Sequence, residues 1–169
     1  MTIYVGLLRA VNVGGTGKLP MSELRAMCEA ADFTRVRTYI QSGNVVFAAD
    51  EPEKIVKATL ERALEAYAGK PVGVMVRTGP AMAAILVANP FSAAASNQTL
   101  TIFLDDPPPG NALADVIGRR DEEIALGARE IYVHYRSGIG TSKLKIPAAA
   151  RGTARNMNTV AKLAEWATI

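Results

Sequence analysis

Apolar positions recur with two different periods along the first half of the chain, and the changes of period predict six elements. Apolar runs of β-prone residues indicate strands, and apolar residues three and four positions apart indicate amphipathic helices. The expected elements are, in order, a strand at 3–8, a helix at 21–31, strands at 36–40 and 45–48, a helix between Pro52 and Gly69, and a strand at 71–77. Strand, helix, strand, strand, helix, strand is the ferredoxin-like pattern.

The second half resembles a partial repeat of this order. Its expected elements are a connecting helix at 80–88, a strand at 99–104, a helix at 111–117, a hairpin of strands at 123–126 and 130–135 around Gly127, and a last helix at 158–167. We therefore predict an α+β fold of two ferredoxin-like βαββα modules, a duplication joined by a helix. The predicted domains are a first module at 1–78, a connecting helix and loop at 79–98, and a second, incomplete module at 99–169.

Local signals sharpen three of the predicted boundaries. The segment Gln41–Asn44 separates two short strands, and we expect a tight hairpin turn in which Gly43 takes a positive φ. Asp50 with Glu53 three residues later predicts a capping box at the start of the second helix. Gly69 is expected to end that helix.

Composition narrows the class of protein. The chain has 169 residues, of which 49% are apolar and 21% charged, as in ordinary globular domains and unlike disordered or fibrous chains. No apolar run reaches the roughly 18 residues of a membrane helix, and the amino terminus has the pattern of a strand rather than a signal peptide. We expect a cytoplasmic protein that does not associate with membranes.

The ligands that metals favour are scarce. The chain has one histidine and one cysteine, so we predict no metal site, no internal disulfide and no cofactor. Cys28 lies on the apolar stripe of the first helix and is expected in the core. His134 alternates with polar neighbours along a strand, and the sequence places no carboxylate or nucleophile beside it. No catalytic residue is therefore predicted.

Two segments favour an anion. Gly14-Gly15-Thr16-Gly17-Lys18 departs from a phosphate-binding P-loop at Asn12 and Leu19, which leaves either a nest of backbone amides or a plain turn. From Arg136 to Lys162 there are six cations and no acidic residue, although the net charge of the whole chain is only +3. Glycine and proline interrupt this segment, which suits a loop around an anion, while a solvated surface is the alternative.

Several motifs together resemble a bacterial family of uncharacterised proteins, the domain of unknown function 1697. The motifs are Leu8–Gly15 with Pro20-Met21, Val36–Phe47, Asn89-Pro90-Phe91, Gly138–Gly140 with Ser142-Lys143-Leu144, and Thr153–Val160. The sequence departs from the family pattern at Ala10, where glycine is common, and at Met157, where tryptophan is common. The resemblance implies a duplicated α+β fold of ferredoxin-like character and brings no established activity, cofactor or catalytic residue.

We hypothesise that loops of the two halves form one polar pocket for an anionic small molecule that carries a phosphate or a carboxylate. The candidate ligand-binding residues are Arg9, Asn12, Gly14, Gly15, Lys18, Gln41, Ser42, Asn44, Ser142, Lys143, Arg155 and Asn156. Whether the protein is an enzyme or a binding module stays open. The alternative function is a nucleic-acid or protein interaction module that uses the basic segment 136–162, although that segment has no aromatic residue to stack on bases.

Overall fold

The computed structural model of the chain describes residues 1–12 and 18–168. The chain forms two compact units: unit 1 comprises Met1–Ala83 with Leu163–Ile169, and unit 2 comprises Ala84–Lys162. The end of the chain thus belongs to the same unit as its beginning, whereas the predicted modules follow one another along the sequence. Within the described residues, no helix is both long and apolar enough to cross a membrane.

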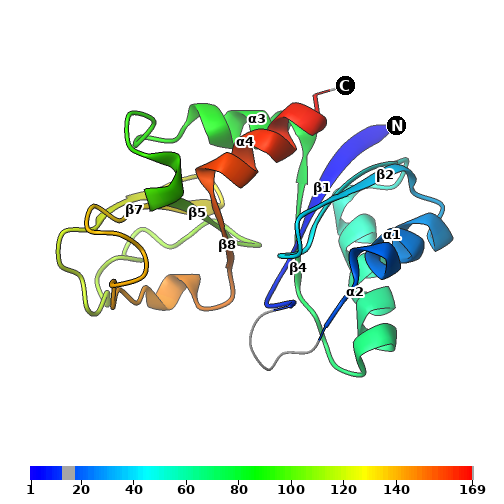
Figure 1. Cartoon of the computed structure of the whole chain (residues 1–169), viewed down its shortest axis with the longest axis horizontal. Coiled ribbons are helices and arrows are strands. Elements are labelled where there is room, and N and C mark those ends of the chain that lie inside the picture. The colour runs from blue at the N-terminus through cyan, green and yellow to red at the C-terminus, as the bar shows by residue number, and fades with distance from the viewer. Residues whose placement is uncertain (13–17, 169) are drawn as a thin grey trace. The chain divides into compact units, whose positions relative to one another are not determined.

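Unit 1 has the β-α-β-β-α-β order expected from the sequence (Figure 1). Its elements are β1 (Thr2–Leu8), α1 (Met21–Ala30), β2 (Thr34–Tyr39), β3 (Asn44–Ala49), α2 (Glu53–Ala68) and β4 (Val74–Thr78). The sheet order is β2-β3-β1-β4, and each neighbouring pair is antiparallel. Consequently β1 and β2 run in the same direction with β3 between them, which is a split β-α-β arrangement.

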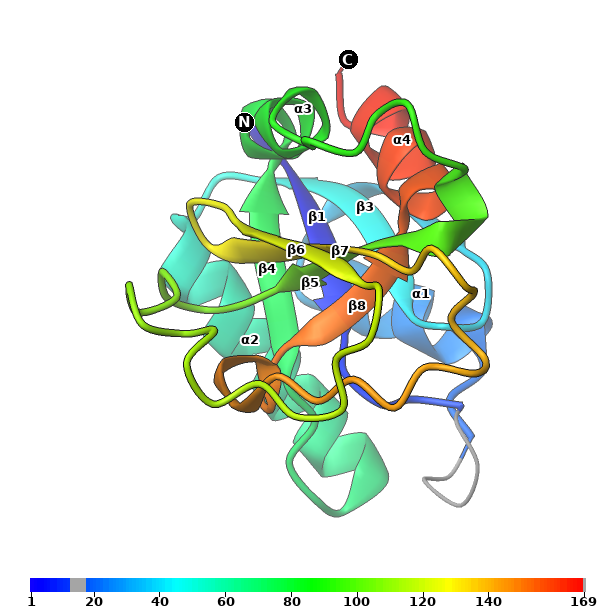
Figure 2. The ribbon, with the colours of Figure 1, turned by 90° about the vertical axis from the view of Figure 1, so that its left-hand side faces the viewer.

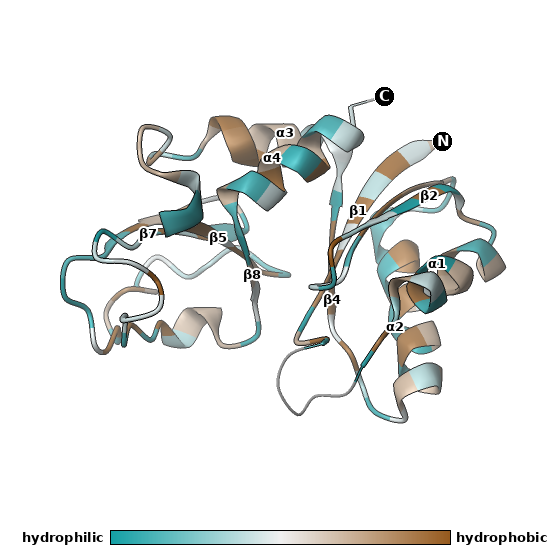
Figure 3. Cartoon of the chain, in the orientation of Figure 1, coloured by the Kyte–Doolittle hydropathy of each residue, from teal (hydrophilic) through white to brown (hydrophobic). Residues whose placement is uncertain are grey.

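The main core of unit 1 lies between one face of this sheet and the two helices. Alternate strand residues such as Leu8, Phe47 and Val74 face Leu24 and Leu60 of the helices. The hydropathy colouring shows the same apolar faces in brown on α1 and α2 (Figure 3). The period of two in the strands and of three to four in the helices thus fills one core from both sides. Cys28 is fully buried in it, as predicted.

The ends of α2 differ in how well the sequence predicted them. The expected capping box is wrong, because Pro52 is the N-cap residue and no side chain caps the helix. Asp50 lies instead 3.7 Å from the amino-terminal nitrogen of Met1. At the other end Gly69 has a left-handed φ of 73°, as predicted. The carbonyl of Pro52 accepts hydrogen bonds from the nitrogens of Ile55 and Val56, and it thus takes the place of the side-chain acceptor of a capping box.

The turn between β2 and β3 is confirmed. Gly43 has a φ of +88°, and its amide carbonyl accepts a hydrogen bond from the nitrogen of Leu8 at 2.8 Å. A Cβ atom on Gly43 would lie 2.7 Å from Cγ2 of Val11 and 2.8 Å from Cβ of Leu8. Glycine is required here by both the backbone conformation and the close approach of β1.

The end of helix α4 (Met157–Trp166) is held on β2 by aromatic contacts within unit 1. The guanidinium carbon of Arg37 lies 3.7 Å from the ring centroid of Trp166, a cation–π geometry. The ring of Tyr39 meets Trp166 edge-on with centroids 5.4 Å apart. Helix α3 (Gly79–Val87) begins close by, since a Cβ on Gly79 would lie 2.3 Å from the carbonyl oxygen of Ala167.

Unit 2 contains the second antiparallel sheet (Figure 2). Its strands are β5 (Thr99–Phe103), β6 (Glu123–Leu126), β7 (Glu130–His134) and β8 (Thr153–Asn156), and short 3₁₀ helices lie at Ser96–Gln98 and Pro147–Ala149. The sheet order is β6-β7-β5-β8, so the second, third, first and fourth strands follow one another as in unit 1. The structure thus has two four-stranded antiparallel sheets, and the proposed ferredoxin-like duplication stays a prediction.

Two predictions in the second half are wrong. Residues 111–115 form turns rather than a helix. Their hydrogen bonds join residues three apart, as from the nitrogen of Ala114 to the carbonyl of Asn111. Ile117 pairs instead with Lys145 in an isolated bridge, which draws the chain out of a helical path. Strand β8 was not predicted, because its sequence Thr-Ala-Arg-Asn contains no β-prone apolar run.

We expect Gly43→Val to destabilise the protein by about 3 kcal/mol or more, since it adds a clash to the strain of a positive φ. Gly69→Val is the matched control, because Gly69 has a φ of +73° with nothing within 4 Å of an added Cβ. Chemical denaturation of both variants gives the comparison. Equal losses in the two variants would show that the close approach to Leu8 and Val11 contributes nothing.

We expect the Cys28 thiol to be unreactive in the folded protein. Burial, and to a smaller extent the charge of Glu29, raises the pKa of Cys28 to about 12. Because the thiolate is the reactive form, a thiol reagent should label the chain only after unfolding. The raised pKa also stabilises the fold below pH 9, and this contribution is lost as the pH rises from 9 towards 12. Rapid labelling under native conditions would contradict the burial.

Candidate functional site

Three chain segments of unit 1 meet where β1 ends. Because β1 is antiparallel to both neighbours, its last residue lies beside the start of β3 and the start of β4. The nitrogen of Arg9 donates to the carbonyl of Gly73 at 2.9 Å, just as Leu8 donates to Gly43. The exit of β1, the β2–β3 turn and the segment between α2 and β4 therefore lie at one edge of the sheet.

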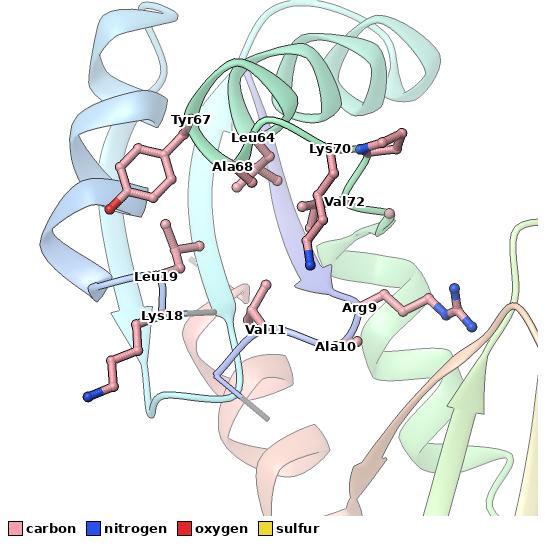
Figure 4. A pocket seen from close by; sticks show the side chains of 12 residues that line it. Arg9, Ala10, Val11, Lys18, Leu19, Leu64, Tyr67, Ala68, Lys70 and Val72 are labelled. Carbon is pink, nitrogen blue, oxygen red and sulfur yellow. The ribbon is translucent and has the colours of Figure 1, made fainter. Parts of the chain in front are cut away.

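A cavity of about 600 Å³ opens at this edge (Figure 4). Its lining comes from the end of β1, the residues before α1, the last turn of α2 and the segment that enters β4. The residues are Arg9, Ala10, Val11, Lys18, Leu19, Leu64, Tyr67, Ala68, Lys70, Pro71, Val72 and Gly73. A volume of this size is typical of small-molecule sites.

Cations are the only charged side chains among these lining residues. Arg9, Lys18 and Lys70 are all exposed and could meet a ligand from solvent. Figure 4 shows the Arg9 guanidinium and the Lys18 ammonium pointing outward on opposite sides, with the Lys70 ammonium directed towards the segment that follows β1. The described rim therefore favours a negatively charged ligand.

Asn12 fixes the wall of this cavity. Its side-chain nitrogen donates to the carbonyls of Leu19, at 2.9 Å, and Gln41, at 2.7 Å. Its side-chain oxygen accepts from the nitrogen of Leu19 at 2.7 Å. The amide thereby joins residue 12 to residue 19 and ties both to the β2–β3 turn. Asn12 was predicted as a ligand-binding residue, and its geometry is that of a positioning residue.

The backbone around Asn12 has an unusual conformation. Ala10 has a φ of 55° and Asn12 a φ of 56°, and Ile40 in the neighbouring turn has a φ of 47°. Asparagine tolerates this left-handed region, whereas alanine and above all a β-branched residue are strained in it. The conformation explains why glycine suits position 10. Such strain persists where surrounding contacts enforce it, and it is common at functional sites.

Two other predicted site residues, Ser42 and Asn44, form hydrogen bonds within the β2–β3 turn. Both hydrogens of the Asn44 amide are used within it, one on the carbonyl of Tyr39 at 2.8 Å and one on the hydroxyl of Ser42 at 2.9 Å. Asn44 is fully buried, and Gln41 is exposed beside it. The predicted residues Gly14 and Gly15 lie outside the described residues.

Arg155 has a different environment from that expected of a ligand-binding cation. It lies on β8, is 7% exposed, and donates from Nη1 to Oγ1 of Thr153 at 2.8 Å and to the carbonyl of Ala154 at 3.0 Å. Burial lowers its pKa to about 10. Asn156 follows it and caps α4, since its side-chain oxygen accepts from the nitrogen of Thr159 at 3.0 Å.

Ser142 lies at a second cavity, of about 500 Å³, within unit 2. Its hydroxyl donates to Oε2 of Glu122 at 2.5 Å, and the nitrogen of Arg120 donates to Oε1 at 2.6 Å. These two hydrogen bonds lower the pKa of Glu122. Ser137 donates to Asp121 in the same cavity. The hydroxyls of Ser137 and Ser142 thus donate to the carboxylates of Asp121 and Glu122. The predicted site residue Lys143, next to Ser142, is exposed.

His134 has a partner that the sequence did not place. The register of β6 and β7 sets Glu123 opposite His134, and Nδ1 of the imidazole donates to Oε1 of Glu123 at 2.9 Å. The Phe91 ring lies 5.8 Å from the imidazole between centroids. Neither His134 nor Glu123 lines one of the two cavities described above. In the described part of the chain, no cluster of three or more His, Cys, Asp or Glu side chains could hold a metal ion.

The cavity of unit 1 also has residues that the sequence reasoning missed. Tyr67, Lys70 and Val72 come from the end of α2 and the entry to β4, about 60 residues from Arg9 in the sequence. The strand order of the predicted sheet could have shown that these residues lie near Arg9. In a split β-α-β sheet the entry to the fourth strand lies next to the exit of the first, so Arg9 at the end of β1 and the α2–β4 connection are neighbours.

We expect Asn12→Ala to destabilise unit 1 by about 2–3 kcal/mol, because three hydrogen bonds are lost, two of them to the backbone of the buried Leu19 and one to the exposed carbonyl of Gln41. Asn12→Gly separates the causes, since glycine accepts the positive φ but also lacks the amide. Faster hydrogen exchange at the Leu19 nitrogen should accompany both changes. Unaltered exchange at Leu19 in both variants would show that the amide does not hold this segment.

Comparison with known proteins agrees with this fold. The structure of the conserved bacterial protein SP0830 from Streptococcus pneumoniae matches with a TM-score of 0.83 and 22% identity, over 100% of this chain and 99% of that chain. This likeness shows a shared fold. No curated protein matches the chain significantly. Residues 1–132 match the family described as "Protein of unknown function (DUF1697)", and because they are most of the chain, the protein belongs to this family.

Proposed function

We propose that the protein binds an anionic small molecule, bearing a phosphate or a carboxylate, in the cavity at the end of β1. One observation carries the proposal: the charged side chains among the described lining residues are Arg9, Lys18 and Lys70, all cationic. An anion there would form charge-assisted hydrogen bonds, which are stronger than those between neutral groups. The pocket shared by both halves, as hypothesised from the sequence, stays a prediction.

The proposal concerns binding rather than catalysis. The described lining has no carboxylate, imidazole or thiol that could act as a general base or acid. Its polar side chains are the three cations and the hydroxyl of Tyr67. These groups can attract and orient an anion, and we assign them no proton transfer.

The basic segment 136–162 supports the second candidate function, binding of a polyanion. Arg136, Lys143, Lys145 and Arg151 are exposed, whereas Arg155 is buried and cannot contribute to such a surface. A surface of this kind would bind polyanions with a steep dependence on salt and without preference for one ligand. The two candidates therefore differ in which cations matter.

We expect Lys70→Glu to weaken the binding of inorganic phosphate or a carboxylate at least tenfold, because it places a negative charge inside the cavity rim. Lys54→Glu is the matched control: Lys54 is exposed on α2, the helix that precedes Lys70, it lies outside the cavity, and its replacement changes the net charge by the same amount. Isothermal calorimetry gives the dissociation constants. Ligand at 100 times its dissociation constant should stabilise the wild-type fold by about 2.7 kcal/mol.

A third variant distinguishes the polyanion candidate. Lys145→Glu removes an exposed cation of the basic segment and leaves the cavity of unit 1 unchanged. Equal weakening by Lys70→Glu, Lys54→Glu and Lys145→Glu would overturn the cavity proposal and indicate diffuse surface binding. Weakening by Lys70→Glu alone supports it.

A further inference from the structure

We infer that the ligand of this cavity is amphipathic, with its anionic group at the rim and a hydrocarbon body on the floor. The inference rests on the proposed function and specifies the class of ligand. It follows from what lies beneath the three cations, which is the edge of a hydrophobic core rather than a polar surface.

The floor of the cavity consists of core residues. Val11, Leu19 and Leu64 line the cavity and belong to the main core of unit 1, where they are 7%, 5% and 1% exposed. Val72 also lines it and packs against the same core. In Figure 4 these aliphatic side chains lie at the centre, between the last turn of α2 and the segment after β1. The cavity thus opens directly onto the end of the core.

The lining is unsuited to a bare inorganic anion. Sites for phosphate alone surround it with backbone amides and hydroxyl groups. Here the one hydroxyl among the described lining side chains belongs to Tyr67, and seven of the other lining residues are aliphatic or proline: Ala10, Val11, Leu19, Leu64, Ala68, Pro71 and Val72. A phosphate ion would leave the accessible apolar lining, at Ala68, Pro71 and Val72, in contact with water.

Size leads to the same ligand class. The cavity has about 600 Å³, and a water molecule occupies roughly 30 Å³ of liquid, so a single small anion would fill a minor part of it. Long cationic side chains suit a site of two parts, because their methylene stems pack on apolar surface while the charge remains at the solvent boundary. Lys70 is therefore placed to meet a head group while the hydrocarbon lies below it.

A homologous series of carboxylates tests the inference. Dissociation constants would be measured by calorimetry or by NMR titration for acetate, butanoate, hexanoate and octanoate, with inorganic phosphate as the probe for the anionic group alone. We expect affinity to rise by up to about fourfold per methylene until the floor is covered, as for burial of apolar surface. An affinity that does not change along the series would overturn the inference.

Ala68→Leu blocks the floor specifically. Ala68 lines the cavity on an exposed turn of α2, so a larger side chain there fills space without entering the core. We expect this variant to lose the gain from acetate to octanoate. Ala58→Leu, exposed on the same helix and outside the cavity, should retain the full gain. Retention of the gain in Ala68→Leu would overturn the inference.

The failure of this inference can be distinguished from the failure of the proposed function. If phosphate and all four carboxylates bind alike and Lys70→Glu weakens each, the anion site stands and the amphipathic ligand is wrong. If octanol binds as tightly as octanoate and Lys70→Glu has no effect, the anionic group is wrong. If no probe binds, both proposals fail.

Discussion

The pairing of β1 with a neighbour on each side is the constraint on which the site depends. Antiparallel pairing with β3 and with β4 brings the end of β1 beside the beginnings of both strands. Burial of Tyr4 and Leu8 with the core residues of α1 and α2 holds one face of β1 on the helices, and hydrogen bonds from Leu8 to Gly43 and from Arg9 to Gly73 continue the two pairings past the end of the strand. The cavity lies at the end of the core of unit 1, and its position follows from the strand pairing rather than from any single loop.

Strain at this edge is balanced by contacts that act only in the folded state. Left-handed conformations at Ala10, Asn12 and Ile40 each cost of order 1–3 kcal/mol. The three hydrogen bonds of the Asn12 amide, the bond from Leu8 to Gly43 and the packing of Val11 offset that cost. The wall of the cavity is therefore held in one arrangement before a ligand arrives, which reduces the entropy that binding must overcome.

The sequence predicted the elements of unit 1 well because each is long enough to show its period and ends at a strong signal, such as Gly43 or Gly69. It failed where tertiary contact overrides a weak local pattern, as in the polar strand β8 and the turns at 111–115. For the site, charge identified Arg9 and Lys18. Charge could not show that Arg155 is buried, and spacing could not show that Lys70 lies near Arg9, since both depend on how the chain packs.

Shared residues couple the cavity to the stability of unit 1. Leu19 and Val11 belong both to the cavity floor and to the core, and Asn12 holds Leu19 in place. A ligand whose hydrocarbon body covers these side chains would extend the core by its own apolar surface, so its binding energy adds to the stability of the same packing. A ligand held by the rim cations alone would leave that surface in water and stabilise the unit only through its charge. The balance between hydrocarbon and charge in the ligand therefore sets how strongly binding protects the fold around β1.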